Sequence, residues 1–313
     1  MYYIRNRDNK SIYTKQRGID MNIKDSILKI LPDKICIKLL YHKRLKKKLN
    51  LKNPQTFNEK LQWLKLYDRN PKYTQMVDKY EAKKYVSNII GDEYIIPTLG
   101  IYEKFDDINF EKLPEEFVMK CTHDSGGVVI CKDKGRFDKE NAKSKLENSL
   151  RNNYYYSGRE WPYKNVKPRI IIEKLLEDDE NEDLVDYKFM CFNGKVKCSF
   201  VCLNRRSKDG LNVDFYDLKW NKLPFERHYP NSNIVLDKPK NYEKMIELAE
   251  KLSQDIPFVR VDFYEVKEKI YFGELTFFPG CGFEEFTPEE WDKKLGELIE
   301  LPKQKKKRIR YEK

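Results

Sequence analysis

Apolar and charged residues alternate in two runs near the C-terminus, FVRVDF and YFGELT, which flank a charged turn. Alternation with a period of two is typical of strands that are buried on one face. If residues 267–269 form a three-residue hairpin loop, Asp262 lies opposite Glu274. Arg260 then lies opposite Thr276 on the same face. The other, apolar face is expected to carry Val259, Val261, Phe263, Tyr271 and Leu275.

A second predicted hairpin lies upstream, where the runs EFVMK and VVIC flank a polar loop over residues 122–127. The adjacent Gly126 and Gly127 allow positive φ and a close approach of a ligand to the backbone. Consecutive N–H groups in such a turn can hold an anion, and Lys120 ends the first run as a point charge. Ser-Gly-Gly alone is also typical of a flexible turn, so the loop is a candidate phosphate-binding element only in combination with other groups.

Helical periodicity dominates between residue 23 and about residue 90. Thr56 is a suitable N-cap, and residues 73–87 are expected to form one helix that stops before Gly91. Asn193-Gly194 between two apolar runs predicts a type I′ hairpin turn. Further helices are expected over residues 138–152, 241–253 and 288–299. Helices combined with antiparallel hairpins predict an α+β fold.

The two carboxylates of the C-terminal hairpin require an explanation, because like charges on opposite strand positions repel each other. One explanation is a polar surface on which Arg260 neutralises Asp262. The other is a divalent cation, since Mg²⁺ commonly takes one or two carboxylates together with substrate phosphates. Lys120 and the glycine-rich loop favour the cation, because these elements together can bind Mg-ATP. The chain contains neither G-x-x-x-x-G-K-[ST] nor G-x-G-x-x-G.

The order of these elements resembles that of ATP-grasp ligases, and more narrowly that of the TupA-like ATP-grasp proteins of bacterial surface-polysaccharide gene clusters. The segments that carry the resemblance are NPQTFNEK, WLKLYDR, GREWPY, DYKF, FVRVD and GELTF, within residues 53–302. The resemblance implies an ATP-grasp fold, with two α+β lobes whose antiparallel sheets grip ATP. The chain then divides into a flexible arm (1–20), a helical N-terminal region (21–96), the catalytic domain (97–302) and a basic tail (303–313).

The resemblance also implies nucleotide contacts. Lys120 would contact the α- or β-phosphate, and Lys188 would be a second phosphate contact. The flexible lid over the phosphates would consist of Ser125, Gly126 and Gly127. The adenine would be lined by Glu173, Lys174 and Leu176, with backbone groups of the last two reading its edge. The ribose would be held by one acidic residue among Asp178, Asp179 and Glu180, of which Glu180 is taken as the candidate.

Metal and catalytic roles follow from the same resemblance. Asp262 and Glu274 would bind Mg²⁺, and Arg260 would stabilise charge on the transferred phosphoryl group or the acyl-phosphate. Thr276 stands where many ATP-grasp enzymes carry Asn, so it is a weaker candidate ligand. Asp124 is a second departure, because an acidic residue beside phosphates is unfavourable unless its side chain points away.

Two further segments have competing interpretations. The segment Gly158–Tyr163 is either an ordered surface loop or a recognition element for an anionic acceptor sugar, because Arg and aromatic faces suit such a ligand. Gly280 and Gly282 form a simple turn or line the acceptor site. Cys281 is not expected to be a nucleophile, since no His stands in a recognisable pairing context.

The composition of the chain indicates the cellular compartment in which the protein is expected to work. The chain has 313 residues, 40% of them hydrophobic, and no apolar run approaches the ~18 residues of a membrane span. The N-terminus lacks the apolar core of a signal peptide. Seven cysteines, an odd number without C-x-x-C, suit a reducing cytoplasm.

The net charge of +11 is concentrated in residues 42–48 and 303–310. Solvated chain ends are one explanation, and the preferred one for the tail. Attraction to the anionic inner face of a membrane is another. Nucleic acid is ranked last, because no nucleic-acid module is visible and no aromatic residues interrupt the basic runs.

These observations predict an ATP- and Mg²⁺-dependent carboxylate–amine ligase that forms an amide through an acyl-phosphate. By resemblance, the carboxylate belongs to a uronic acid of a surface polysaccharide, and the amine to an amino acid or amino alcohol. Two alternatives are a glycosyltransferase of the same pathway and a non-catalytic basic adaptor that docks at the membrane. The glycosyltransferase would prefer a sugar nucleotide to ATP, whereas the adaptor would not need Asp262 and Glu274.

Overall fold

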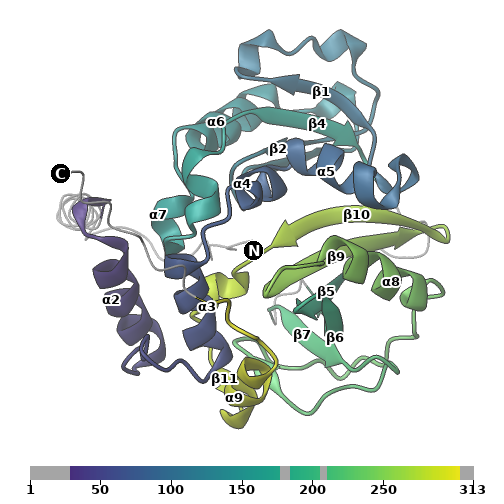
Figure 1. The fold of residues 1–313 in the computed structure, drawn as a ribbon. Coiled ribbons are helices and arrows are strands. Elements are labelled where there is room, and N and C mark those ends of the chain that lie inside the picture. Colours follow the sequence, from purple (N-terminus) through teal and green to yellow (C-terminus); the bar gives the residue numbers. More distant parts are fainter. Residues whose placement is uncertain (1–28, 177–183, 205–209, 304–313) are drawn as a thin grey trace.

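The computed structural model describes residues 29–176, 184–204 and 210–303. Two antiparallel sheets form two lobes, one above the other in Figure 1, and α4 and α5 lie between the upper sheet and β10. The upper sheet has the order β1-β4-β2-β3, and the lower sheet has the order β10-β9-β5-β6-β7. Helices with antiparallel sheets confirm the predicted α+β class.

The strands of the upper sheet are β1 (Thr98–Tyr102), β2 (Phe117–Cys121), β3 (Val128–Cys131) and β4 (Ile170–Lys174). Those of the lower sheet are β5 (Asp186–Phe192), β6 (Lys195–Leu203), β7 (Asn212–Tyr216), β9 (Phe258–Val266) and β10 (Lys269–Thr276). A small pair is formed by β8 (Glu226–Arg227) and β11 (Phe286–Thr287). The α-helices are α2 (Asp33–Leu45), α3 (Phe57–Tyr67), α4 (Lys72–Val77), α5 (Glu81–Ile90), α6 (Lys139–Leu150), α7 (Tyr155–Gly158), α8 (Tyr242–Leu252) and α9 (Glu290–Glu297).

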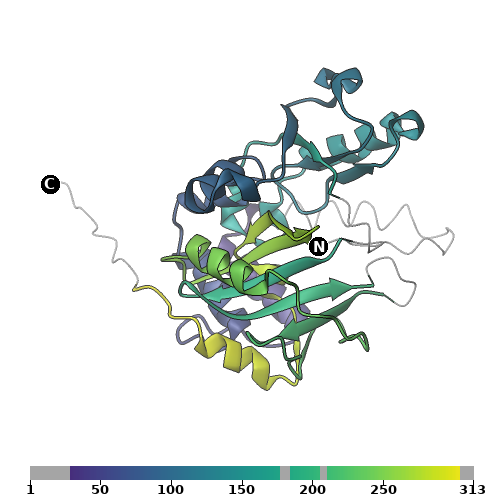
Figure 2. The same cartoon turned by 90° about the vertical axis from the view of Figure 1, so that its right-hand side faces the viewer.

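Each lobe has a hydrophobic core of its own. The upper core joins Phe117 and Ile172 of the sheet to Leu146 of α6. In the lower lobe, α8 covers one face of the sheet (Figure 2), where Tyr242 packs on Phe189 with ring centroids 5.5 Å apart. Because side chains alternate along a strand, Asp186 and Lys188 of β5, like Arg260 and Asp262 of β9, lie on the face away from α8.

The hairpin of β9 and β10 has the predicted pairing but not the predicted turn. Asp262 lies opposite Glu274, and Arg260 lies opposite Thr276. The loop has two residues, Lys267 and Glu268, both at positive φ, as in a type I′ turn. A bulge between residues 272 and 274 then shifts the register by one position.

The bulge corrects the prediction for the apolar face. Phe272, not Tyr271, pairs with Phe263, and Phe272 is 5% exposed. Gly273 is the bulged residue, and a Cβ atom there would lie 3.1 Å from the carbonyl oxygen of Asp262. Close approach of the neighbouring backbone thus favours glycine at this position.

Local sequence accounts for several other elements. Thr56 and Glu59 form the capping box that begins α3. Asn193 and Gly194, both at positive φ, form the predicted turn between β5 and β6. The helices expected over residues 138–152, 241–253 and 288–299 are α6, α8 and α9, each somewhat shorter than predicted. Within the described ranges, no helix is long and apolar enough to cross a bilayer.

The prediction of one helix over residues 73–87 is wrong in one respect, because this segment forms two separate helices, α4 and α5. The chain turns between them at residues 78–80, and the amide of Lys79 donates to the carbonyl oxygen of Thr122 at 3.0 Å. The backbone thus exchanges a helical hydrogen bond for one to the glycine-rich hairpin. The predicted end of this segment before Gly91 is confirmed.

Candidate active site

Charged residues of three neighbouring strands converge on the face of the lower sheet that α8 leaves uncovered. Asp262 on β9 lies between Glu274 on β10 and Lys188 on β5. Arg260 donates to the two carboxylate oxygens of Asp262 at 2.7 and 2.6 Å, and to Glu274 at 2.7 Å. The ammonium nitrogen of Lys188 lies 2.6 Å from Asp262 and 2.5 Å from Asp186. We call Asp186, Lys188, Arg260, Asp262 and Glu274 the charged cluster.

The two paired carboxylates differ in burial. Asp262 is 1% exposed, whereas the side chain of Glu274 is 42% exposed. Burial raises the pKa of Glu274, but the positive charges of Arg260 and Lys188 outweigh this effect and hold the pKa well below its usual value. Burial lowers the pKa of Lys188, and Asp186 with Asp262 raises it above its usual value. Glu274 and Lys188 are therefore both charged at neutral pH.

The donor set fits Mg²⁺ at Glu274 better than at Asp262. Both oxygens of Asp262 accept hydrogen bonds from Arg260 or Lys188. Oε1 of Glu274 accepts from Arg260 and from the hydroxyl of Thr276, whereas Oε2 accepts none from the described residues. No group of three or more His, Cys, Asp or Glu side chains in these ranges could hold a metal alone. Mg²⁺ commonly combines one carboxylate with phosphate oxygens and water, which Glu274 can accommodate.

The predicted phosphate lysine, Lys120, lies at the end of β2 beside Glu173 on β4. Its ammonium group is 2.7 Å from Glu173, and Lys83 of α5 pairs with the same carboxylate. Burial raises the pKa of Glu173, but Lys120 and Lys83 bring it below its usual value. In this arrangement Glu173 is the counter-ion of two lysines, beside the adenine role that the resemblance implied. Lys83 was missed, because nothing in the sequence distinguishes it from other helical lysines.

The three predicted residues of the glycine-rich loop differ in their exposure to solvent. Gly126 is exposed and Ser125 is half-buried, whereas Gly127 is buried. The amide of Gly127 donates to the carboxylate of Asp124 at 3.1 Å, and Asp124 also accepts from the hydroxyl of Ser149. Asp124 is 9% exposed, so its charge is turned into the fold. This orientation removes the expected conflict between Asp124 and a bound phosphate.

Two side chains bring this loop next to the charged cluster. Lys79 donates to the carbonyl oxygen of Asp124, and its charge contributes to the low pKa of Glu274. Burial and the charge of Glu160 raise the pKa of Tyr154, and a hydrogen bond to Ser125 acts against this rise. The charge of Glu274 in turn raises the pKa of Glu160. The two predicted hairpins therefore meet around one site, although they belong to different sheets.

The predicted adenine end of the site lies where β4 stops. The amide of Lys174 donates to the carbonyl oxygen of Pro97 at 3.0 Å, so this N–H group is already engaged. Its side chain is exposed, and Leu176 is half-buried just beyond the strand. Asp178, Asp179 and the predicted ribose residue Glu180 lie outside the described residues.

The segment Gly158–Tyr163 is not a surface loop, because Arg159 and Glu160 are each 2% exposed. A Cβ atom on Gly158 would lie 2.6 Å from the sulfur of Cys281, so the segment packs directly against residues 279–282. The ammonium group of Lys65 joins the two segments, since it donates to the carbonyl oxygens of Gly158 and Cys281 at 2.7 Å each. Lys65 was missed as a site residue, although it lies in the WLKLYDR segment.

Burial has opposite effects on the two charged groups here. It raises the pKa of Glu160 above its usual value even though Lys65 and Arg260 act against it. It lowers the pKa of Lys65, which Glu160 only partly offsets. Burial also raises the pKa of the Cys281 thiol, which argues against a thiolate nucleophile and agrees with the sequence-based expectation.

Comparisons with known proteins bear on this site. A family model described as TupA-like ATPgrasp matches residues 59–300. A comparison with curated proteins gave no match. Similar solved structures include the D-alanine–D-alanine ligase of Bacillus anthracis complexed with ATP, at 17% identity over 64% of this chain and 53% of that chain, with a TM-score of 0.36.

Two further structures show the same degree of similarity. The D-alanine–D-alanine ligase of Helicobacter pylori has 14% identity over 78% of this chain and 69% of that chain, with a TM-score of 0.42. The biotin carboxylase of Campylobacter jejuni has 15% identity over 73% of this chain and 48% of that chain, with a TM-score of 0.42. This chain therefore spans between 48% and 69% of the length of these three structures.

The family model supplies the identification, since it covers well over half of the chain and includes both predicted hairpins. It confirms the predicted ATP-grasp fold, and ATP with Mg²⁺ is the cofactor pair of that fold. The chain belongs to the TupA-like ATP-grasp family.

Proposed function

We propose that this protein is an ATP- and Mg²⁺-dependent carboxylate–amine ligase. The observation that carries the proposal is the meeting of the glycine-rich hairpin and the charged cluster through Lys79 and Tyr154. One side offers backbone and lysine groups suited to phosphates. The other side offers a partly exposed carboxylate, Glu274, for the metal and a fixed guanidinium, Arg260. Binding of ATP between them is the arrangement that family membership supports.

In the proposed reaction, an oxygen of the substrate carboxylate attacks the γ-phosphorus of ATP. ADP leaves, and an acyl-phosphate forms. The amine nitrogen then attacks the carbonyl carbon and loses a proton, and inorganic phosphate leaves as the amide forms. Mg²⁺ held through Glu274 would neutralise charge on the phosphate oxygens. The chain's part is positioning and charge stabilisation, as in phosphoryl transfer generally.

Arg260 is suited to stabilise the phosphoryl group, because Asp262 binds it through two parallel hydrogen bonds. Such a fork fixes the orientation of the guanidinium before any substrate arrives. Lys188 donates to the same carboxylate of Asp262, which places a second cation beside Arg260. This cation is suited to contact a phosphate oxygen. We assign Arg260 and Lys188 as the groups that contact the transferred phosphoryl group.

Glu160 is the candidate acceptor for the proton that the amine loses. Its raised pKa favours proton uptake. The charges of Arg260 and Glu274 both act on this pKa, Arg260 lowering it and Glu274 raising it. The neighbouring Lys65 holds the Gly158 and Cys281 backbones in place around it. We propose that the segment Gly158–Tyr163 belongs to the acceptor side of the site.

We further propose that the carboxylate belongs to a uronic acid of a surface polysaccharide, and the amine to an amino acid or amino alcohol. The support for this pairing is the association of the resembled family with polysaccharide gene clusters. Release of ADP on mixing protein, Mg-ATP, a uronate and an amine tests the reaction. ADP release that requires both substrates supports the ligase.

A thermal-shift measurement separates the alternatives. Mg-ATP should stabilise the wild type, and Glu274→Gln should weaken that effect. Stabilisation by a sugar nucleotide but not by ATP would replace the ligase with the glycosyltransferase. Full biological activity of Glu274→Gln would support the non-catalytic adaptor and contradict the ligase.

A further inference from the structure

One side of α2 carries apolar and basic side chains that neither the core nor the proposed site uses. The helix buries Cys36, Ile37 and Tyr41 against the rest of the protein. Ile35 and Leu39, one turn apart on the outer side, are 47% and 54% exposed. Ile30, just before the helix, is 85% exposed. Isolated exposed apolar residues are ordinary, but three in one short segment indicate an interaction surface.

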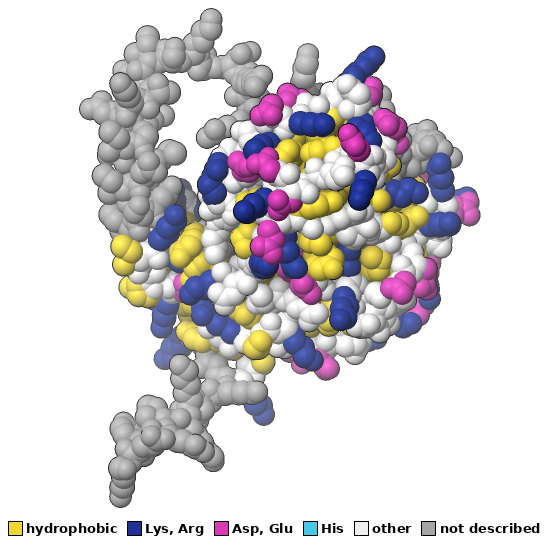
Figure 3. Space-filling view, turned by 90° about the horizontal axis from the view of Figure 1, so that it is seen from above, with side chains coloured by type: hydrophobic (Ala, Val, Ile, Leu, Met, Phe, Trp, Pro, Cys, Tyr) yellow, Lys and Arg dark blue, Asp and Glu magenta, His cyan; other side chains and the backbone are white. Residues whose placement is uncertain are grey.

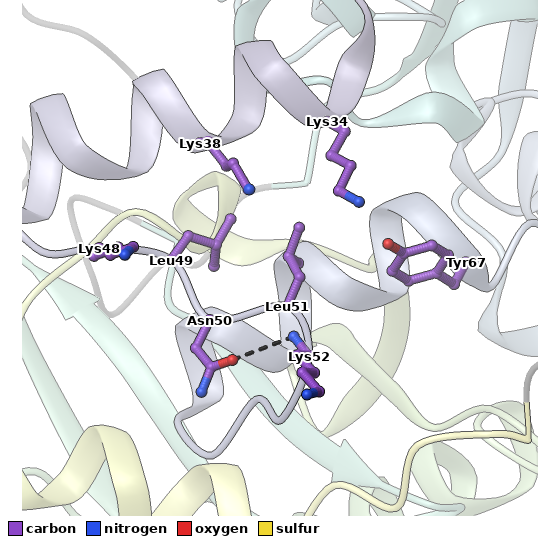
Figure 4. A pocket seen from close by; sticks show the side chains of 8 residues that line it. All are labelled: Lys34, Lys38, Lys48, Leu49, Asn50, Leu51, Lys52 and Tyr67. Atoms are coloured by element: carbon purple, nitrogen blue, oxygen red, sulfur yellow. Dashed lines mark hydrogen bonds between the residues drawn. The ribbon is translucent and has the colours of Figure 1, made fainter.

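A basic pocket adjoins these residues. Lys34 and Lys38 of α2 line one side of a pocket of about 580 Å³, and Lys48 and Lys52 of the following segment line other parts of its rim (Figure 4). The pocket is also lined by Leu49, Asn50, Leu51 and Tyr67. None of the four lysines forms an ion pair with another described residue, although Lys47 beside them pairs with Glu289. Four cations around one pocket, none of them paired with an acidic group in the described part of the chain, are suited to an anion from outside the chain.

The basic surface extends beyond the pocket. Lys43 and Arg44 in the last turn of α2 and Lys46 after it are exposed and likewise unpaired within the described ranges. Charges on the upper lobe are distributed differently, because acidic and basic side chains are interspersed there (Figure 3). At the left edge of that view, on the side where Figure 1 places α2, yellow and dark blue side chains adjoin.

The helix that carries this surface is firmly held. Asp33 at its start pairs with Arg69, which lies just after the end of α3, at 2.6 Å, and Tyr41 packs edge-on against Phe283. The outer face therefore meets its partner as a preformed surface.

We propose that the α2 surface, made of Ile30, Ile35, Leu39 and the surrounding lysines, docks the protein on an anionic lipid bilayer. Ile35 and Leu39 would enter the interfacial layer, and the lysines would bind phosphate headgroups, which is how basic amphipathic helices bind membranes. The apolar residues favour a bilayer over a soluble polyanion, because a soluble polyanion would leave Ile35 and Leu39 in water. This inference does not depend on the ligase proposal.

Sedimentation with vesicles tests it. The probes are vesicles of phosphatidylcholine alone and of phosphatidylcholine mixed with phosphatidylglycerol. We expect binding only to the mixed vesicles, and weaker binding at high salt. Lys34→Glu/Lys38→Glu should lower the affinity about thirtyfold or more, and Ile35→Ser/Leu39→Ser about tenfold. Lys104→Glu/Lys145→Glu makes the same change in net charge on the upper lobe and should have little effect.

Four outcomes would overturn the proposal. One is the absence of binding to mixed vesicles. A second is an equal loss in the Lys104→Glu/Lys145→Glu control, which would reduce the effect to net charge. A third is undiminished binding by Ile35→Ser/Leu39→Ser, which would leave the pocket as a site for a soluble polyanion. The fourth is loss of binding on deletion of residues 1–28 while the α2 variants bind normally. An unchanged thermal midpoint in each variant shows that the fold is intact.

Discussion

The ammonium group of Lys65 donates to the carbonyl oxygen of Cys281 at 2.7 Å, across 216 positions of sequence. The same nitrogen donates to the carbonyl oxygen of Gly158 at 2.7 Å. Lys65 is fully buried, and it also lies over the ring of Phe283 at 4.5 Å from the centroid. One cation on α3 thus connects the segments around Gly158 and Cys281. Its removal should lower both the stability and the catalytic activity of the protein.

Lys65→Met should be strongly destabilising. It leaves two buried carbonyl oxygens without this donor and removes the positive charge that most lowers the pKa of Glu160, which we expect to cost about 2–5 kcal/mol in the free energy of unfolding. Urea denaturation measures it. Lys60→Met is the matched control, because Lys60 on the same helix donates to one carbonyl, that of Ile299. Its cost should be about 1 kcal/mol. Equal costs for the two variants would contradict the role given to Lys65.

Glu160→Gln should separate stability from activity. Because burial raises the pKa of Glu160 above 4.5, the folded state holds this proton to higher pH than the unfolded chain does. Its contribution to wild-type stability is complete below pH 4.5 and is lost as the pH rises toward the folded-state pKa.

Glutamine does not titrate, so the thermal midpoint of Glu160→Gln relative to wild type should increase with pH above about 4.5. Thermal scans from pH 4 to 8 check this difference. Amine-dependent ADP release should fall about a hundredfold or more, since a proton acceptor is removed. A midpoint difference that stays constant with pH would argue against a raised pKa for Glu160.

Glu274→Gln should affect ligand binding more than folding. The side chain is partly exposed, so the change in unfolding free energy should stay below about 1 kcal/mol. In wild type, Mg-ATP at a hundred times its Kd should add about 2.7 kcal/mol of stability. This gain should largely disappear in the variant. Glu268→Gln, an exposed change in the turn of the same hairpin, should retain it. An undiminished gain in Glu274→Gln would remove Glu274 from the metal site.

The two glycines of the loop should differ in their tolerance of alanine. A Cβ atom at Gly127 would lie 2.5 Å from the hydroxyl oxygen of Ser149 and 3.0 Å from Cβ of Cys121. We expect Gly127→Ala to cost about 1–3 kcal/mol. Gly126 has open space around it, so Gly126→Ala should change stability by less than about 0.5 kcal/mol. Denaturant titration of both variants measures the contrast, and similar costs would contradict the observed loop packing.

The hairpin of β9 and β10 shows what alternation can and cannot predict. The pairing of Asp262 with Glu274 was predicted correctly from a three-residue loop. The structure reaches the same pairing through a two-residue loop and a bulge at Gly273. The segment between Asp262 and Glu274 has an odd number of residues, and the unpaired one lies in the loop in the first case and in the bulge in the second, so the polar face near Asp262 is the same. Only the residues between loop and bulge differ, which is why the prediction for Tyr271 was wrong.

Long-range partners explain most of what the sequence did not reveal. The break between α4 and α5 depends on the amide of Lys79 meeting the carbonyl oxygen of Thr122. The pairing of Lys83 with Glu173 joins a helix to a strand far along the chain. Neither interaction leaves a local pattern, because helix period and turn chemistry report only on neighbouring residues. The strand residues of the site were predictable, since alternation fixes the face on which they lie.

The bulge at Gly273 also determines how the hairpin can change length. Its tip, Lys267 and Glu268, is exposed, and the extra residue of β10 sits between the tip and the carboxylates. One residue inserted in the turn can be absorbed by straightening the bulge, which leaves Asp262 opposite Glu274. The bulge can therefore compensate for a one-residue insertion at the tip, so the pairing of the two carboxylates is preserved.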